Sequence, residues 1–181
     1  AIYKQYMLLS LHGQSKDALA KNKPGAWEYD IVAPLYKCNM TDIMAAIGLV
    51  QLRRYPELLE KRYKLVRLYN ELLSGCGVER APHFREDERS SCHLYLARLT
   101  GKTMAQRNAV IEKMAEQGVA TNVHYKPLPL LTAYKDLGFD IKDYPNAYAQ
   151  FENEITLPLY STLTEEDVRY ICAALKTCLQ D

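Results

Sequence analysis

The stretch PLYKCNMTDIMAAIG, from Pro34 to Gly48, organises the chain because it joins a polar loop to a long apolar-striped helix. The loop carries Tyr36, Lys37 and Asn39, and Thr41 is a residue type that caps helices. A helix N-terminus exposes unpaired backbone N–H groups, which favour a nearby anion. The pattern therefore predicts a candidate anion contact at the entry to this helix.

Lys37 has two interpretations. A single loop lysine is most often only a solvated charge. The alternative is a point charge aimed at a phosphate, with Asn39 as an added donor. Asp42 already compensates the helix dipole and would repel an anion, so phosphate binding would rest on Lys37 and Asn39 rather than on the helix end.

The apolar stripe continues past Pro56 and ends near Gly75 and Gly77. Pro56 is read either as a kink or as the first turn of a second helix. Together the helical pieces span about nine turns, too long for one small globule to cover. We expect a spine that joins two bodies.

Beyond Gly77 the pattern alternates between strands and helices. Strands are expected over residues 78–83, 93–99, 119–125 and 155–159, with 119–125 the clearest. Helices are expected over 103–117, 130–137 and 144–153, and a last helix after residue 164. Capping boxes are expected to begin two of them, Thr103 with Gln106 and Thr164 with Asp167. This order predicts an α+β fold in which helices cover a small sheet.

His124 is the histidine best placed for a site, because it ends the strand expected over 119–125 on its polar face. A surface histidine without function is the alternative. The chain's 4 histidines lack metal-ligand spacing, so no metal site is expected. The pattern supplies no complete catalytic apparatus.

Composition excludes several classes of partner. A formal net charge of +1 with mixed signs argues against nucleic-acid binding and against attraction to an anionic membrane. No apolar run is long enough to span a bilayer, and the N-terminus lacks a signal-peptide pattern. The 5 cysteines are scattered, which favours reduced thiols and a cytoplasmic location.

Six segments in order resemble one enzyme family. The quoted stretch, extended to PLYKCNMTDIMAAIGLVQL, resembles a segment of the DegT/DnrJ/EryC1/StrS family of sugar aminotransferases. The likeness extends to LHGQSKDA (11–18), WEYDIV (27–32), CHLYLARL (92–99), VATNVHYKPL (119–128) and ITLPLYSTLTEEDV (155–168). Departures include Leu35 for a glycine, Cys38 for a tyrosine and Met44 for a glutamine.

The resemblance implies the C-terminal part of a fold-type I aminotransferase. Residues 1–40 would be the tail of the large cofactor domain with an interface loop, residues 41–75 an interdomain helix, and residues 76–181 the small domain, with a mainly antiparallel sheet. The family's Schiff-base lysine lies in an S-x-H-x-x-K segment upstream of the position matching Leu11. We therefore expect this chain to be inactive alone.

The implied reaction is transamination with pyridoxal 5'-phosphate, in which an amino acid, expected to be glutamate, gives its nitrogen to a keto group of a nucleotide-linked sugar. In a homodimer, the loop with Tyr36, Lys37 and Asn39 would contact the cofactor phosphate of the partner subunit.

The resemblance places His124 and Tyr125 near the sugar substrate, with Trp27 and Tyr29 in the same neighbourhood. The competing hypothesis is a non-catalytic regulatory or interaction protein that keeps this small domain. The sequence upstream of this chain separates the two: a lysine in an S-x-H-x-x-K context would support the enzyme, and its loss would support the regulator.

Overall fold

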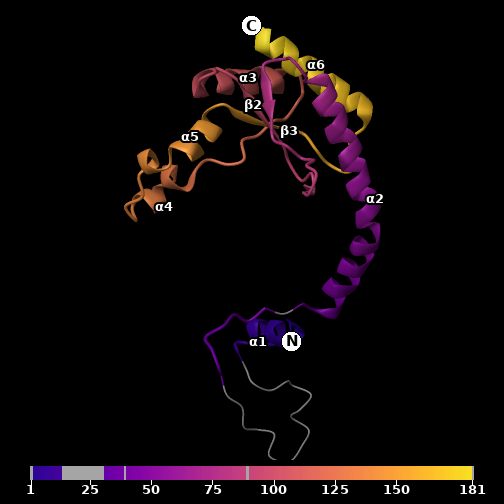
Figure 1. The fold of residues 1–181 in the computed structure, drawn as a ribbon, viewed down its shortest axis with the longest axis vertical. Coiled ribbons are helices and arrows are strands. Elements are labelled where there is room, and N and C mark those ends of the chain that lie inside the picture. Colours follow the sequence, from indigo (N-terminus) through magenta and orange to yellow (C-terminus); the bar gives the residue numbers. More distant parts are fainter. Residues whose placement is uncertain (1, 14–30, 39, 89, 181) are drawn as a thin grey trace, which may run out of the picture. The chain divides into compact units, whose positions relative to one another are not determined.

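The computed structural model describes residues 2–13, 31–38, 40–88 and 90–180. The chain forms two compact units, Ala1–Arg54 and Tyr55–Asp181, whose boundary falls inside helix α2. The order of elements along the chain can be followed by colour in Figure 1.

The first unit begins with helix α1, Ile2–Ser10. Gly13 follows it at φ +76°, where a Cβ atom would collide with the Ala33 carbonyl oxygen. The Gly13 N–H donates to the Leu8 carbonyl at 2.7 Å, and its own carbonyl accepts from the Val32 N–H at 2.9 Å. A residue without a side chain is therefore needed where residues 31–38 return beside the end of α1.

Helix α2, Asp42–Leu72, is one continuous helix. Pro56 lies inside it, so the second of the two sequence interpretations, a separate helix beginning there, is wrong. Proline removes one N–H from the ladder but does not end the helix here, since strong helix formers flank it on both sides.

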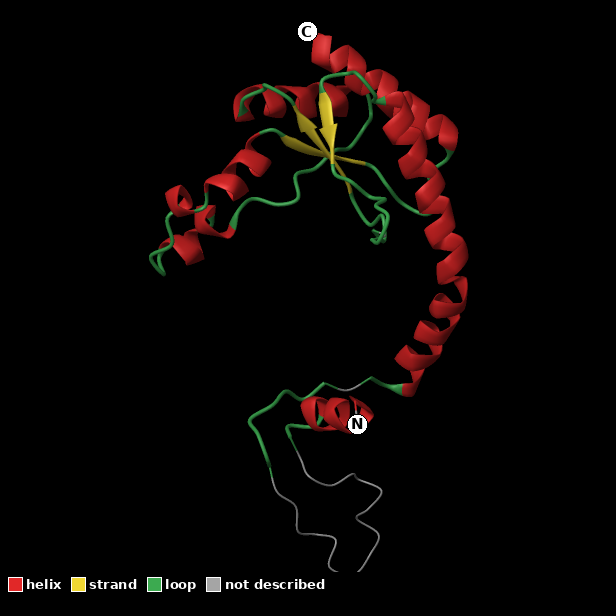
Figure 2. Cartoon of the chain, viewed as in Figure 1, coloured by secondary structure: helices red, strands yellow, loops and turns green. Residues whose placement is uncertain are grey.

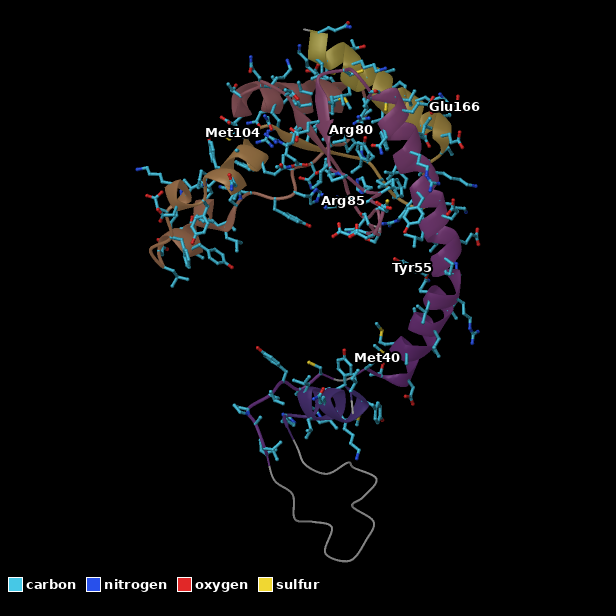
Figure 3. All side chains as sticks on the ribbon, in the orientation of Figure 1. Met40, Tyr55, Arg80, Arg85, Met104 and Glu166 are labelled. Carbon is cyan, nitrogen blue, oxygen red and sulfur yellow. The ribbon has the colours of Figure 1, made fainter. Side chains whose placement is uncertain are left out.

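The two halves of α2 differ in burial. The residues of the helix that are buried all lie in its C-terminal half: Leu65, Val66, Leu68 and Tyr69. The N-terminal half leaves its large apolar side chains exposed: Ile43, Met44, Ile47, Leu49, Val50 and Leu52. The lead-in residue Met40 and the mid-helix Tyr55 are labelled in Figure 3, and both are exposed.

The second unit is built on a three-stranded antiparallel sheet of order β1-β2-β3 (Figure 2). The strands are β1 (Val78–Arg80), β2 (Tyr95–Leu99) and β3 (Glu154–Leu157). On β2 the residues alternate between buried and half-buried, as a sheet with one core face requires. All four residues of β3 are buried, so both faces of this strand are covered.

The core face of the sheet packs against helices. Helix α3 (Met104–Glu116) and helix α6 (Glu165–Gln180) contact each other, and α3 also contacts β3 (Figure 1). Both predicted capping boxes are present: Thr103 with Gln106 at α3, and Thr164 with Asp167 at α6. These boxes satisfy N–H groups that the first helical turn leaves unpaired.

The C-terminal half of α2 is joined to the sheet by an aromatic stack. The rings of Tyr69 and Tyr95 lie 4.5 Å apart between centroids at an interplanar angle of 26°. The Tyr69 hydroxyl donates to the Pro158 carbonyl at 2.8 Å, and the Tyr95 hydroxyl donates to Asn70 Oδ1 at 2.9 Å. Both buried hydroxyls therefore have partners, as burial of a tyrosine requires.

The segment between α3 and β3 holds short helices: η2 (Leu128–Leu130), α4 (Thr132–Lys135), η3 (Ile141–Asp143) and α5 (Pro145–Glu152). The strand expected over residues 119–125 is wrong. Only Asn122 pairs, in an isolated bridge with Thr156, and Asn122 Oδ1 accepts from the neighbouring Val123 N–H at 2.7 Å. A side chain that bonds its own backbone competes with a sheet ladder.

The α+β class is confirmed, with helices against a small antiparallel sheet. No helix in the described ranges has the length and apolar character needed to cross a membrane.

Candidate functional site

Tyr36 and Lys37 lie in the first unit on the segment that returns beside the end of α1. Lys37 forms an antiparallel bridge with Leu11, the His12 N–H donates to the Tyr36 carbonyl at 3.0 Å, and the Cys38 N–H donates to the Ser10 carbonyl at 2.9 Å. Backbone hydrogen bonds thus position this segment, while both side chains stay exposed, Tyr36 by 79%.

The Lys37 ammonium has no acidic partner among the described residues. Asp42 lies in the first turn of α2, and the Met44 N–H donates to Thr41 Oγ1 at 3.4 Å. An unpaired ammonium and a phenolic hydroxyl on one segment are donors that suit a phosphate group. The residues present therefore fit a phosphate-bearing ligand.

Three predicted site residues, Trp27, Tyr29 and Asn39, lie outside the described residues. Their assignment to sugar and cofactor binding remains a prediction.

His124 lies in the second unit, beside the free edge of β3. Asn122 and Thr156 exchange backbone hydrogen bonds of 3.2 and 2.7 Å there, which carries the chain past β3. The His124 backbone N–H donates to Glu154 Oε2 at 3.0 Å, and its ring Nδ1 lies 2.9 Å from Thr156 Oγ1. A buried side-chain network therefore holds both the backbone and the ring of His124.

Glu154 is the centre of this network. Its carboxylate accepts from the Thr156 hydroxyl at 2.6 Å, and its side chain is 1% exposed. Burial raises the pKa of the Glu154 carboxyl, and hydrogen bonds from Thr156 and His124 and the charge of Arg107 act against that rise.

Arg107 on α3 supplies the positive charge beside Glu154. Its Nη1 donates to the Glu154 backbone carbonyl at 3.0 Å, and its guanidinium lies 5.0 Å from the centroid of the Phe151 ring. Burial lowers the pKa of Arg107, and the Glu154 charge opposes that change. A buried arginine and a buried glutamate thus offset each other's charge.

Tyr125 follows His124 with its side chain 72% exposed, and its ring meets the His124 ring edge to face at 4.7 Å. The structure therefore groups His124 and Tyr125 with Thr156 and Glu154. Sequence reasoning named the first two and missed the last two. The available signal was a glutamate in the short apolar strand EITL, where a charge is unusual unless it is paired.

A solved structure has the same fold as this chain. The putative sugar aminotransferase Spr1654 from Streptococcus pneumoniae, in its PMP-form, is 56% identical with a TM-score of 0.88, and the match covers 99% of this chain and 45% of that one. The PLP-form of the same protein has a TM-score of 0.85 at 52% identity.

Two curated relatives are similar over almost the whole chain. The spore coat polysaccharide biosynthesis protein SpsC of Bacillus subtilis is 31% identical, covering 93% of this chain and 44% of the relative. The UDP-4-amino-4,6-dideoxy-N-acetyl-beta-L-altrosamine transaminase of Campylobacter jejuni is 28% identical, covering 96% of this chain and 44% of the relative. The chain thus spans less than half the length of these relatives.

The family model described as the DegT/DnrJ/EryC1/StrS aminotransferase family matches residues 1–176. This match covers nearly every residue and confirms the resemblance carried by the six sequence segments. The chain belongs to the DegT/DnrJ/EryC1/StrS aminotransferase family.

Proposed function

We propose that this chain is the C-terminal part of a pyridoxal-phosphate-dependent aminotransferase that converts a keto group on a nucleotide-linked sugar into an amine. The observation that carries the proposal is the family match over residues 1–176. The Campylobacter jejuni relative, named for a UDP-linked amino sugar, supports the substrate class. The nitrogen donor is an amino acid, expected to be glutamate, and the product serves polysaccharide or secondary-metabolite synthesis.

Lys37 and Tyr36, with Asn39, bind the cofactor phosphate of the partner subunit in a homodimer. The fit of an unpaired ammonium and a hydroxyl to a phosphate supports this role. The cofactor, when bound, supplies the electron sink for amine transfer. This chain's residues hold it in place and take no proton from the substrate.

His124 and Tyr125 bind the sugar, and Trp27 and Tyr29, which lie outside the described residues, are further predicted sugar contacts of the full-length protein. The hydrogen bonds that orient the His124 ring and the 72% exposure of Tyr125 support this role, because a fixed imidazole beside an exposed phenol offers polar and stacking contacts to a sugar. The sugar is then oriented by side chains that hydrogen bonds to Glu154 and Thr156 hold in place.

Residues 1–40 belong to the cofactor domain, residues 41–75 form the interdomain helix and residues 76–181 form the small domain. The exposed apolar face of the N-terminal half of α2, defined by Ile43, Met44, Ile47 and Val50, supports this division. An apolar face of this kind is typical of a surface that another part of the assembly covers.

The first test uses this chain alone. We expect no transamination, and no borohydride-stable adduct on any lysine at stoichiometric pyridoxal phosphate, because the family's cofactor lysine belongs to a segment upstream of the position matching Leu11. Mass spectrometry after reduction checks this expectation. Turnover together with a single modified lysine would overturn it.

The second test replaces Lys37 in the full-length protein. Loss of one charged phosphate contact is worth about 1.5–3 kcal/mol, so Lys37→Ala should weaken cofactor binding roughly tenfold to a hundredfold with little effect on unfolding. The matched control is Lys4→Ala, which removes an exposed lysine from α1. Equal cofactor retention in both variants would mean that Lys37 is only a solvated surface charge. A full-length protein without any cofactor affinity would favour the regulatory hypothesis.

A further inference from the structure

Three side chains form a continuous hydrogen-bonded line from the interior to His124. Glu154 and Thr156 are two residues apart on β3 and therefore lie on the same face of the strand. Glu154 Oε1 lies 2.6 Å from Thr156 Oγ1, which lies 2.9 Å from His124 Nδ1. The second carboxylate oxygen of Glu154 accepts the His124 backbone N–H at 3.0 Å.

The line has only two consistent proton arrangements, because a threonine hydroxyl has a single hydrogen to donate. With Glu154 ionised, Thr156 donates to Glu154, and its oxygen must accept from a protonated Nδ1 of His124. With Glu154 protonated, or replaced by a donor, Thr156 can donate to Nδ1 instead, and the neutral ring then carries its proton on Nε2.

Burial raises the pKa of Glu154, but the hydrogen bonds and the positive charge around its carboxylate favour the ionised form. The carboxylate accepts from the Thr156 hydroxyl and the His124 backbone N–H, and the Arg107 guanidinium, which donates to the Glu154 backbone carbonyl, adds a positive charge from α3. Two donors and one cation in a buried site stabilise a carboxylate against the cost of its desolvation.

We propose that Glu154 is a positioning residue that acts through Thr156 to hold neutral His124 in the tautomer with its proton on Nδ1. Nε2 of His124 has no hydrogen-bond partner in the described part of the chain. This atom is not fully buried, so a ligand can reach it. Nε2 is then presented as a hydrogen-bond acceptor. On the proposed function, in which His124 contacts the sugar, its partner is a hydroxyl or N–H donor of that substrate.

A positioning role of Glu154 and a merely structural role predict different behaviour of the His124 ring. A structural network would keep His124 in place whichever ring nitrogen carried the proton. The tautomer of His124 is therefore the readout that a packing role would not move.

The test is ¹⁵N NMR of this chain with histidine labelled, at an alkaline pH where imidazole is neutral. With only 4 histidines in the chain, a His124→Gln variant assigns the His124 signals. In the unsubstituted protein, His124 should show a pyrrole-type Nδ1 and a pyridine-type Nε2.

Two variants should reverse the tautomer. In Glu154→Gln the amide oxygen can still accept the His124 backbone N–H while the amide nitrogen donates to Thr156, so Thr156 donates to Nδ1 and the proton moves to Nε2. Thr156→Val removes the hydroxyl and leaves Nδ1 without its acceptor. The matched control, Thr156→Ser, keeps the hydroxyl and should keep the proton on Nδ1.

A proton on Nε2 in the unsubstituted protein would overturn the proposal, as would an unchanged tautomer in folded Glu154→Gln or Thr156→Val. If Glu154→Gln does not fold, the comparison of Thr156→Val with Thr156→Ser tests the proposal instead. A separate assay in the full-length protein tests whether His124 contacts the sugar: Thr156→Val should lower kcat/KM for the sugar roughly three- to tenfold relative to Thr156→Ser, with cofactor affinity unchanged. A reversed tautomer without a change in kcat/KM would keep the positioning role and reject His124 as a sugar contact.

Discussion

Tyr69→Phe should destabilise the second unit through a single lost hydroxyl. The Tyr69 side chain is fully buried, and its hydroxyl donates to the Pro158 carbonyl at 2.8 Å. Phenylalanine keeps the ring and its stack on Tyr95 at 4.5 Å between centroids, so no large cavity forms. The substitution thus isolates one hydrogen bond between α2 and the segment after β3.

The magnitude follows from what the Pro158 carbonyl loses. A buried acceptor left without a donor costs about 1–3 kcal/mol, but Pro158 is only half-buried and water can reach part of it. We therefore expect a loss of about 1–2 kcal/mol in the free energy of unfolding. Burial raises the pKa of Tyr69 well above its ordinary value of 10.0, so the hydroxyl stays protonated and the loss should be the same at neutral and mildly alkaline pH.

Urea unfolding followed by far-UV circular dichroism measures this loss, with the slope checked for equality between variants. The matched control is Tyr170→Phe, because Tyr170 donates to the Gln117 carbonyl at 2.9 Å but is 56% exposed. Water can replace that bond, so the control should lose less than about 0.5 kcal/mol. An equal loss in the two variants, or a larger one for Tyr170→Phe, would refute the argument that burial decides the value of the Tyr69 hydrogen bond.

Three further predictions concern the helices, the thiols and pH. Thr164→Ala removes the hydroxyl that accepts the Asp167 N–H and should cost about 1 kcal/mol of unfolding free energy in the same urea assay, whereas Thr164→Ser should cost little. Cys38 is exposed and should react with a thiol reagent at once, while burial raises the pKa of Cys172 to about 12, so that thiol should react only on unfolding; simultaneous reaction of both in native buffer would contradict this. Burial lowers the pKa of His83 below its ordinary value of 6.5. As pH falls below 6.5, His83 therefore takes up a proton in the unfolded chain before it does so in the folded chain. Unfolding free energy should therefore fall on acidification by up to about 1.4 kcal/mol per pH unit from this group, and His83→Gln should flatten the slope; parallel pH profiles would reject that contribution.

Local patterns with their own stop and start signals were predicted well from the sequence. The capping boxes Thr103–Gln106 and Thr164–Asp167 begin α3 and α6 as expected, because the bonds that define them join residues three apart. Such features need no knowledge of the rest of the fold. The α+β class followed from the order of these elements.

The features that depend on distant residues were missed. Residues 119–125 alternate like a strand, but only Asn122 pairs with β3, through an isolated bridge. Alternation in a sequence does not reveal whether a neighbouring strand offers an edge for pairing. The partners of His124 were missed for a related reason: Glu154 and Thr156 are about thirty residues later in the chain, and only the fold brings them within 3.0 Å of it. Sequence reasoning could find the exposed histidine but not the buried acid that orients it.

The uneven burial along α2 connects the fold to the proposed function. In its C-terminal half Tyr69 is buried and stacks on Tyr95 of β2, whereas its N-terminal half exposes the apolar face defined by Ile43, Met44, Ile47 and Val50. Covering each such side chain is worth about 1.5–3 kcal/mol, so covering the four would release about 6–12 kcal/mol. That amount is comparable to the whole stability of an ordinary domain. On the proposed function, the association that covers this face also places Tyr36 and Lys37 at the phosphate, because they immediately precede the same helix. Substitutions that weaken the apolar contact, such as Ile47→Lys, should therefore lower cofactor affinity of the full-length protein without touching a cofactor-binding residue.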